Sequence, residues 1–116
     1  MAYWTDGRIK GFITSTLRSG FRRWPSKYEC LNAAKVGKKL NIKTNRLAEH
    51  YKCASCKGEF TNKDVEVDHI NPVVDPVEGF TTWDNFIKRL YVSNKSLQVL
   101  CKKCHKIKTK EERKQR

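Results

Sequence analysis

The tetrapeptides Cys53-Ala54-Ser55-Cys56 and Cys101-Lys102-Lys103-Cys104 set the architecture of this 116-residue chain. Each C-x-x-C pair forms a tight turn that directs two sulfur atoms at one ion, and two such pairs supply the four ligands of a tetrahedral zinc site. The 44 intervening residues exceed the loop of an ordinary zinc ribbon, so the closed loop must contain structure of its own. A redox-active pair is the less favoured alternative, because it requires one such motif beside a βαβ pattern. The spacing therefore predicts a structural Zn²⁺ bound by Cys53, Cys56, Cys101 and Cys104.

The rest of the composition indicates one small domain with a thin apolar core. Hydrophobic residues make up 38% of the 13.6 kDa chain, so folding is expected to need a metal staple in addition to apolar burial. In a reducing compartment, cysteines spaced in this way serve as metal ligands rather than in disulfides. The fifth cysteine, Cys30, is expected to be a small buried apolar side chain. No apolar run reaches the ~20 residues of a membrane span, and a secretory signal is absent, which predicts a cytoplasmic protein without a membrane partner.

Basic residues lie mainly in the two flanks of the sequence. The net charge is +13, with +8 in residues 1–50, −1 in residues 51–100 and +6 in residues 101–116. An excess of this size predicts a polyanionic partner, DNA in the first place, although a solubilising surface gives the same count. A membrane surface is less favoured, because no lipid-facing amphipathic helix is apparent. The residues predicted to contact DNA phosphates are Arg18, Arg22, Arg23, Lys106, Lys108 and Lys110.

The first part of the chain is expected to be helical. A first helix is expected to begin at Thr5 or Asp6, because apolar residues recur after them at helical spacing. A capping-box pattern that opens at Ser26 predicts a second helix, which ends at Gly37. The polar and basic segment from Lys38 to Arg46 is then expected to be a connector on the surface. Whether this connector is only solvated or contacts phosphates is left open.

The second part mixes strands and helices, which places the chain in the α+β class. The alternation in Val65-Glu66-Val67-Asp68 predicts a short half-buried strand, and residues 73–79 an extended loop. Thr81 is expected to cap a helix whose apolar side chains share one stripe, which we expect to pack into the core rather than to bind a cofactor. The apolar segment from Leu97 to Leu100 precedes a very basic last helix that begins at Cys101.

Three polar residues inside and beside the zinc loop form a second candidate site. Asp68 and His69 are adjacent, and His105 directly follows the last cysteine ligand. Successive residues of a helix point about 100° apart, so Cys104 can bind zinc while His105 points elsewhere. A carboxylate and two imidazoles suit a divalent cation and a general base. A satisfied structural histidine is the commoner explanation of a lone Asp-His pair, but the two cysteine pairs that frame this one favour the catalytic explanation.

Together these segments resemble the HNH endonuclease family. Its zinc-containing members show C-x-x-C, then D-H-I-x-P, then N-L-x-x-L-C-x-x-C-H-x-x-K. The corresponding segments here are residues 53–56, Asp68-His69-Ile70-Asn71-Pro72, and SLQVLCKKCHKIK over residues 96–108. The resemblance covers roughly residues 50–112, and the wider sequence is similar to small HNH proteins encoded by bacteriophages and prophages.

The resemblance implies an α+β fold with a ββα-metal (His-Me finger) nuclease core, in which two antiparallel strands and a helix surround one catalytic divalent cation, Mg²⁺, Mn²⁺ or Ni²⁺. It divides the chain into a basic helical N-terminal extension, residues 1–49, and an HNH nuclease domain with a basic C-terminal helix, residues 50–116. By position, His69 would be the general base that activates water, while Asp68 and His105 would bind the cation. The implied activity is hydrolysis of DNA phosphodiester bonds, by nicking or double-strand cleavage, to 5′-phosphate and 3′-hydroxyl ends.

Two points of the predicted site depend on local geometry. Adjacent residues of a regular strand face opposite sides, so Asp68 and His69 can share a phosphate only if the strand ends or bends between them. At the position of the family's middle asparagine this sequence has Ser96, and Asn94 lies two residues earlier. Either Asn94 or Ser96 is expected to support the catalytic loop, with Asn85 as a weaker candidate.

An endonuclease is therefore the function we expect, and a non-enzymatic module is the alternative. Such a module would be stabilised by zinc and would bind DNA or assist phage packaging. RNA binding is less favoured, because the sequence contains no aromatic ribonucleoprotein motif. The resemblance further implies a phage-encoded protein that acts in the bacterial host cytoplasm, in a homing or a packaging role, with the phage terminase as a candidate partner.

Overall fold

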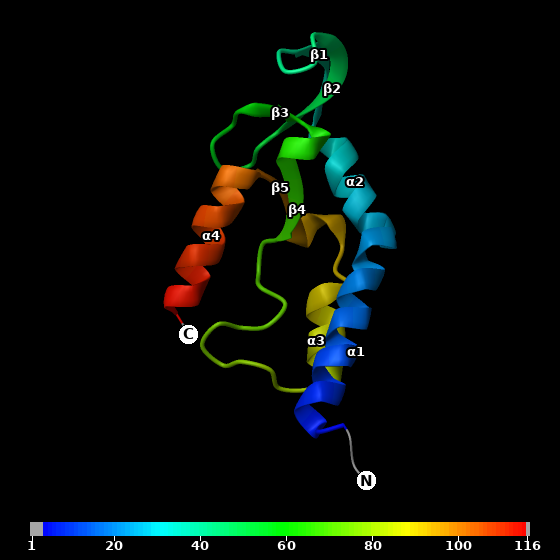
Figure 1. The fold of residues 1–116 in the computed structure, drawn as a ribbon, viewed down its shortest axis with the longest axis vertical. Coiled ribbons are helices and arrows are strands. Elements are labelled where there is room, and N and C mark those ends of the chain that lie inside the picture. The colour runs from blue at the N-terminus through cyan, green and yellow to red at the C-terminus, as the bar shows by residue number, and fades with distance from the viewer. Residues whose placement is uncertain (1–3, 116) are drawn as a thin grey trace.

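The computed structural model describes residues 4–115, and these form a mixed α+β fold, as expected. The body is elongated, at 57 × 28 × 25 Å, with one pair of strands standing at one end and two helices at the other (Figure 1). In chain order the elements are α1 (Asp6–Gly20), η1 (Phe21–Arg23), α2 (Pro25–Ala33), β1 (Lys35–Asn41), β2 (Arg46–Lys52), β3 (Glu59–Thr61), η2 (Asn62–Asp64), β4 (Val65–His69), α3 (Trp83–Leu90), η3 (Asn94–Ser96), β5 (Leu97–Cys101) and α4 (Lys102–Lys114).

The strands form two antiparallel sheets. One has the order β1-β2-β3, and the other pairs β4 with β5 so that Val65 lies opposite Cys101 and His69 opposite Leu97. The helix α4 follows β5 directly. Between β4 and β5 the chain makes an excursion that carries α3, and the backbone N–H of Ile70 donates to the Ser96 carbonyl at its base, over 3.0 Å. The excursion therefore starts and ends beside the last residue of β4.

Side-chain caps fix where three of the helices begin. Thr5 rather than Asp6 caps α1, because its hydroxyl accepts the backbone N–H of Arg8 at 3.2 Å. Thr82, not the expected Thr81, caps α3 by accepting the N–H of Asn85 at 3.1 Å. The helix α4 begins directly after Cys101, whose sulfur occupies the capping position. These starts agree with the predicted helices to within one residue.

The prediction for residues 25–46 is wrong for both ends of the second helix and for the connector. The second helix begins with Pro25 in its first turn rather than at Ser26, and it ends at Ala33. Gly37 does not stop a helix: at φ +117° it sits at a register shift within β1. The expected connector from Lys38 to Arg46 is instead a β-hairpin, most of whose residues are exposed, so that it lacks the apolar alternation that marks a half-buried strand. Its second strand β2 also runs through the predicted domain boundary at residues 49 and 50.

The apolar core is divided into small clusters rather than forming one mass. Cys30 is buried at 8% exposure in the largest cluster, as predicted, between α2 and the strands. Phe86 and Leu90 are 3% and 1% exposed, so the apolar stripe of α3 packs into the core, as predicted. The buried members of the largest cluster are Cys30, Tyr51, Val65, Leu97 and Val99; those under α3 are Val73, Phe86 and Leu90.

Hydrogen bonds dock the N-terminal helices onto the excursion around α3. The Tyr91 hydroxyl donates to the Leu17 carbonyl of α1, and the indole N–H of Trp24 donates to the Val92 carbonyl at 2.7 Å. On the other side, the Arg89 guanidinium donates to the Pro72 carbonyl at 2.8 Å. The end of α3 is thus held between α1 and the segment that follows β4.

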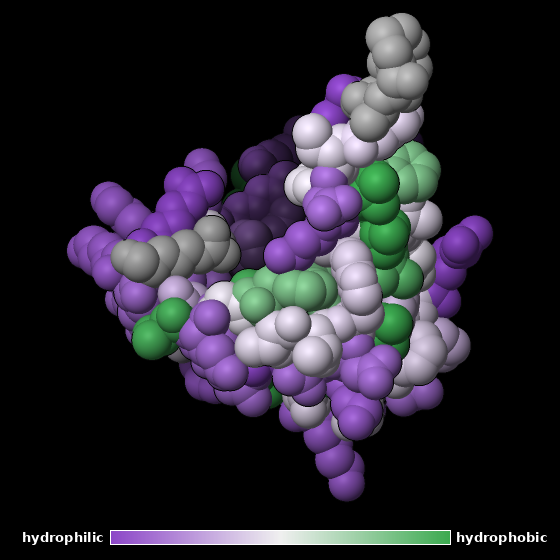
Figure 2. Space-filling model, turned by 90° about the horizontal axis from the view of Figure 1, so that it is seen from below, coloured by the Kyte–Doolittle hydropathy of each residue, from purple (hydrophilic) through white to green (hydrophobic). Residues whose placement is uncertain are grey.

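The outer surface of α1 remains largely uncovered. None of its residues is buried, and Ile9, Phe12 and Ile13 are 43%, 67% and 37% exposed. Figure 2 shows the molecule from below, with hydrophobic side chains exposed among the hydrophilic ones. Within residues 4–115, no helix combines the length and the apolar character that a membrane crossing requires.

Candidate metal centre and carboxylate-imidazole site

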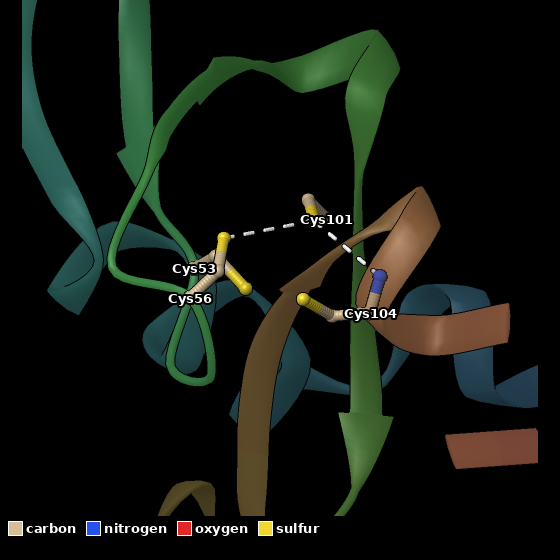
Figure 3. A group of neighbouring side chains, drawn as sticks. All are labelled: Cys53, Cys56, Cys101 and Cys104. Carbon is tan, nitrogen blue, oxygen red and sulfur yellow. Dashed lines mark hydrogen bonds between the residues drawn. The ribbon is translucent and has the colours of Figure 1, made fainter. Parts of the chain in front are cut away.

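The four predicted zinc ligands lie together. The sulfur atoms of Cys53, Cys56, Cys101 and Cys104 are all within 4.8 Å of one another, and the Cys56 and Cys101 sulfurs are 3.9 Å apart. Four thiolates at about 2.3 Å from one tetrahedral ion lie about 3.8 Å from each other, so the cluster has the dimensions of a zinc site. Figure 3 shows one pair on the turn after β2 and the other on the β5–α4 junction, with their sulfurs converging.

Local backbone geometry shapes the first cysteine turn. The Cys53 N–H donates to the Gly58 carbonyl at 2.9 Å, and the Lys57 N–H donates to the Cys53 carbonyl at 3.0 Å. Lys57 lies in the left-handed region at φ +64°. The Gly58 N–H then points at the Cys56 sulfur at 3.4 Å, and a Cβ on Gly58 would meet the Phe60 ring at 2.8 Å. Glycine is therefore required for the turn to close beneath the ring.

Charge repulsion within the cysteine cluster calls for a cation. Burial opposes ionisation of Cys53, yet backbone donors, with that of Cys101 the largest, lower its pKa to about 6. Once neighbouring sulfurs are charged, the hydrogen bond with the Cys101 sulfur raises the pKa of Cys104 to about 12. Four thiolates in contact cannot all ionise at neutral pH without a positive ion among them. The donor set and its geometry both fit a structural ion such as zinc.

A second polar cluster lies where β4 faces α4. The His105 Nδ1 atom is 3.0 Å from Glu66 Oε2, and its Nε2 atom is 3.6 Å from Asp68 Oδ1. The other oxygen of Asp68 accepts hydrogen bonds from Lys108 Nζ at 2.5 Å and from Gln98 Nε2 at 3.3 Å. The two oxygens of Asp68 are thus divided, with one held by protein donors and the other turned to His105.

The Glu66 contact fixes the chemical character of His105. A carboxylate only accepts hydrogen bonds, so Glu66 holds the ring proton on Nδ1. In the neutral imidazole, Nε2 then carries a lone pair that faces Asp68 Oδ1, and two acceptors face each other across 3.6 Å. A proton or a metal ion between these two atoms removes the repulsion between them. Both atoms can lie about 2.1 Å from a single divalent cation, with water completing its coordination.

His69 lies on the opposite side of β4, against the end of α3. Its Nε2 atom is 2.7 Å from the Leu90 carbonyl, which can only accept, so the ring proton is on Nε2. The Phe21 ring packs against the imidazole with centroids 4.7 Å apart. Burial, opposed by the Leu90 hydrogen bond and by the charge of Asp68, lowers the pKa of His69 below its ordinary value. The ring is therefore neutral at pH 7, with Nδ1 as its basic atom.

Asp68 and His69 line one hollow although the strand does not break between them. The ladder continues through the pairs Asp68–Gln98 and His69–Leu97, so the strand does not break or end between the two residues, which was the condition expected from the sequence for their sharing a phosphate. The hollow, of about 200 Å³, wraps around the end of β4 and collects side chains from both of its faces. Its polar lining is Arg18, Asp68, His69, His105, Lys108, Thr109 and Glu112.

The predicted supporting residues do not line the hollow. Asn94 and Ser96 form η3, and their side chains make no hydrogen bond to any residue within 4–115. Ser96 contributes through its backbone carbonyl, which accepts the Ile70 N–H beside His69. The side chain of Asn85 donates to Thr81 at the start of α3. None of the three side chains supports His69; the Leu90 carbonyl holds its imidazole instead.

The residues predicted to contact DNA have different surroundings. Arg18 lines the hollow, where its charge contributes to the lowered pKa of His69 after the larger effect of burial. Lys108 is only 24% exposed, and its ammonium is held by Asp68, the His69 carbonyl and Glu112, so it belongs to the site rather than to a free basic surface. Arg22 donates to Ser19. The remaining three, Arg23, Lys106 and Lys110, are exposed.

Glu66 and Gln98 are site residues that the sequence analysis did not single out. Glu66 lies two residues before Asp68, so the alternation of a strand places both on one face. Gln98 is the cross-strand partner of Asp68. The first position could have been found from strand periodicity, whereas the second required the register of β4 against β5.

Comparison of the chain with protein-family models, with curated proteins and with solved structures finds no match.

Proposed function

We propose that this protein is a metal-dependent DNA endonuclease of the HNH type. The observation that carries the proposal is the hollow at the end of β4, which gathers an acidic ligand, a neutral imidazole with a fixed proton, and two cationic side chains. The order β4, β5, α4, with the β4–β5 ladder antiparallel, agrees with the ββα-metal core that the resemblance implies. The cysteine cluster directly precedes His105 and supports its position.

The donor set supports a divalent cation between Asp68 and His105. One carboxylate oxygen and one imidazole nitrogen face each other there, and Mg²⁺, Mn²⁺ or Ni²⁺ accept such donors together with water. When bound, such a cation supplies positive charge to the phosphate and to the leaving oxygen. Glu66, Lys108 and Gln98 orient the two ligands by binding their other atoms.

The protein residues perform the remaining chemistry. Arg18 draws a phosphate into the hollow and neutralises part of its charge. His69 accepts a proton at Nδ1 from a water molecule, because its Nε2–H is held by the Leu90 carbonyl and its pKa is lowered by burial. The water oxygen then forms a bond to phosphorus as the bond to the 3′ oxygen breaks. That oxygen takes a proton from solvent, which leaves 5′-phosphate and 3′-hydroxyl ends.

The proposal is tested on supercoiled plasmid. Zinc-loaded protein is incubated with Mg²⁺, Mn²⁺ or Ni²⁺ or without added metal, and relaxed and linear products are separated on a gel. We expect cleavage that requires the added metal and is reduced at least ~100-fold in His69→Ala, the usual range for loss of a general base. Glu29→Gln, an exposed change on α2 outside the hollow, is the matched control and should cut like the wild type. Cleavage by His69→Ala at the wild-type rate would refute the proposal.

Metal binding separates the roles of the three residues. In calorimetric titrations of the zinc-loaded protein with Mn²⁺, His69→Ala should keep the affinity of the wild type. Asp68→Ala and His105→Ala should each weaken it, because each removes a ligand atom. Equal loss in all three variants would make His69 a ligand instead of the base.

One observation favours a non-enzymatic alternative. The carboxylate of Asp68 is already bound by the ammonium of Lys108, so the site is electrostatically satisfied by protein groups alone. On this alternative the protein is a zinc-stabilised module that binds DNA or assists packaging with a terminase. It predicts duplex binding with no cleavage in any metal, and no Mn²⁺ binding beyond the cysteine cluster.

A further inference from the structure

The hairpin of β1 and β2 projects from the body of the protein. Six residue pairs join β1 to β2, but the third strand β3 pairs only with His50, Tyr51 and Lys52 at the base. The remainder of the hairpin pairs with no third strand and stands at one end of the molecule (Figure 1). A two-stranded antiparallel ribbon of this kind has dimensions that fit the major groove of B-form DNA, about 12 Å wide.

The turn of the hairpin is built by polar residues alone. The carbonyl of Asn41 accepts the N–H groups of Thr44 and Asn45 at 3.2 and 2.7 Å. The side-chain oxygen of Asn41 accepts the N–H of Lys43 at 3.1 Å, and Asn45 takes the left-handed conformation at φ +57°. These are the interactions that close such turns. Ile42, the remaining turn residue, is therefore not needed to form the turn.

Apolar side chains nonetheless gather at this tip. Ile42 is 91% exposed, Leu47 71% and Leu40 55%, and the last two are cross-strand partners on one face. Single exposed apolar residues are ordinary on a protein surface, but three that share one projecting tip form a small contact surface. The packing of this protein does not account for them.

The charge around the tip identifies its partner. Residues 35–52 contain six basic residues and one acidic residue, Glu49. Lys39 and Lys43 face the carboxylates of Glu59 and Asp64. Lys38 and Arg46 are exposed and form no ion pair with any residue from 4 to 115. Unpaired cations can contact the phosphates of a polyanion, and the apolar side chains between them can contact apolar groups inside its grooves. Duplex DNA offers both kinds of group.

We propose that the β1–β2 hairpin is a DNA-binding arm whose tip enters a groove of duplex DNA. Lys38 and Arg46 contact phosphates on the groove walls, and Ile42 and Leu47 contact sugars and base edges inside it. This proposal rests on DNA as the partner in the proposed function, but it requires no cleavage. It also adds a basic surface distinct from Arg18, Arg22 and Arg23.

Binding to fluorescent DNA and RNA duplexes tests the arm. Fluorescence anisotropy is measured between 50 and 300 mM salt with zinc-loaded protein that carries His69→Ala, so that no DNA is cut. The double variant Lys38→Ala with Arg46→Ala should flatten the plot of log K against log salt by about 1.8, at about 0.9 per phosphate contact. The matched control is Lys88→Ala with Lys95→Ala, which removes the same charge from exposed lysines elsewhere and should leave the slope within 0.5 of the wild type, on the order of half a contact.

The apolar part of the proposal has its own readout. Ile42→Ser should weaken DNA binding about three- to tenfold at every salt concentration and leave the slope unchanged, because it removes an uncharged contact. A-form RNA has a narrow, deep major groove, so an RNA duplex of the same length should bind more weakly and be insensitive to Ile42→Ser. Thermal unfolding and zinc content confirm that each variant is folded.

Each result bears on the arm separately from the nuclease. Hairpin-dependent binding in a protein that never cuts plasmid would support the arm and refute the nuclease. The arm is refuted if the hairpin pair and the control pair change the slope equally, if Ile42→Ser binds like the wild type, or if RNA and DNA duplexes bind alike. Any of these outcomes refutes the arm whether or not the protein cuts plasmid, and plasmid cleavage would then still support the nuclease proposal.

Discussion

Replacing one sulfur of the cysteine cluster should cost most of the stability of the protein. We expect Cys101→Ser to release the metal and to open the loop that runs from Cys56 to Cys101. Closing a loop of about 46 residues removes about 4 kcal/mol of chain entropy from the unfolded state, by the relation used for covalent cross-links. Single domains are stable by only ~5–15 kcal/mol, and the apolar core here is divided into small clusters. At the lower end of that range, where a core divided into small clusters places this protein, a loss of about 4 kcal/mol leaves residues 53–104 only marginally folded.

Serine is the informative substitution at this position. The Cys101 sulfur also caps α4, where it accepts the N–H of Cys104 at 3.5 Å. A serine hydroxyl is among the preferred caps, so the variant keeps the helix start and loses the metal ligand. Cys30→Ser is the matched control, because Cys30 is also buried, at 8% exposure against 4% for Cys101, but lies outside the cluster. It should cost ~1–2 kcal/mol and retain the metal.

The assay combines metal content with urea denaturation followed by circular dichroism. Wild-type protein should carry one zinc per chain, and removal of zinc by a strong chelator should lower its stability as much as Cys101→Ser does. The reasoning fails if well-folded wild type contains no zinc. It also fails if the chelator leaves the urea midpoint unchanged, or if Cys101→Ser and Cys30→Ser lose stability equally.

Three further changes test the rest of the molecule. Because burial lowers the pKa of His69, the cleavage rate should rise with pH through a midpoint below 6.5 and then level off. The stability that neutral His69 contributes is likewise present above pH 6.5 and is lost as pH falls. A midpoint above 7 in the rate profile would contradict this reasoning. Glu66→Gln should weaken Mn²⁺ binding at least ~10-fold and move the ring proton of its histidine partner in ¹⁵N NMR spectra, whereas an unchanged tautomer would show that Glu66 does not hold it. Gly20→Ala should destabilise the protein by ~1–3 kcal/mol in thermal unfolding, because the new Cβ would lie 2.6 Å from the Tyr91 hydroxyl. Gly11→Ala is the control: its Cβ would meet no other atom within 4 Å, so it should stabilise the protein by up to ~1 kcal/mol.

Features whose cause is local were predicted from the sequence. Two C-x-x-C turns bring their own sulfurs together whatever lies between them, so the cluster followed from spacing alone. The apolar stripe of α3 repeats at helical period and is buried as expected. Cys30, an apolar side chain within a helix, is also buried as expected.

Features that depend on contacts between distant parts of the chain were not predicted from the sequence. The residues of the β1–β2 hairpin are mostly exposed, so no alternation marked Lys38 to Arg46 as strands. The hydrogen bond that holds His69 comes from the Leu90 carbonyl, and a backbone atom leaves no trace in residue type. Asp68 and His69 line one hollow without a break in the strand between them, because the hollow takes side chains from both faces of β4, and this arrangement depends on the fold around the strand.

The order in which the paired elements occur along the chain also decides when the protein becomes complete on the ribosome. β1, β2 and β3 are consecutive, so their sheet can form as soon as they emerge. The cysteine cluster cannot form until Cys101 and Cys104 have been synthesised, because Cys53 and Cys56 supply only two of its four sulfurs. Likewise, β4 cannot pair until β5 follows the α3 excursion. His105 follows the last sulfur ligand and brings the second half of the proposed cation site. A nascent chain that already displays its basic hairpin therefore lacks His105, and with it half of the proposed cation site, until α4 is synthesised.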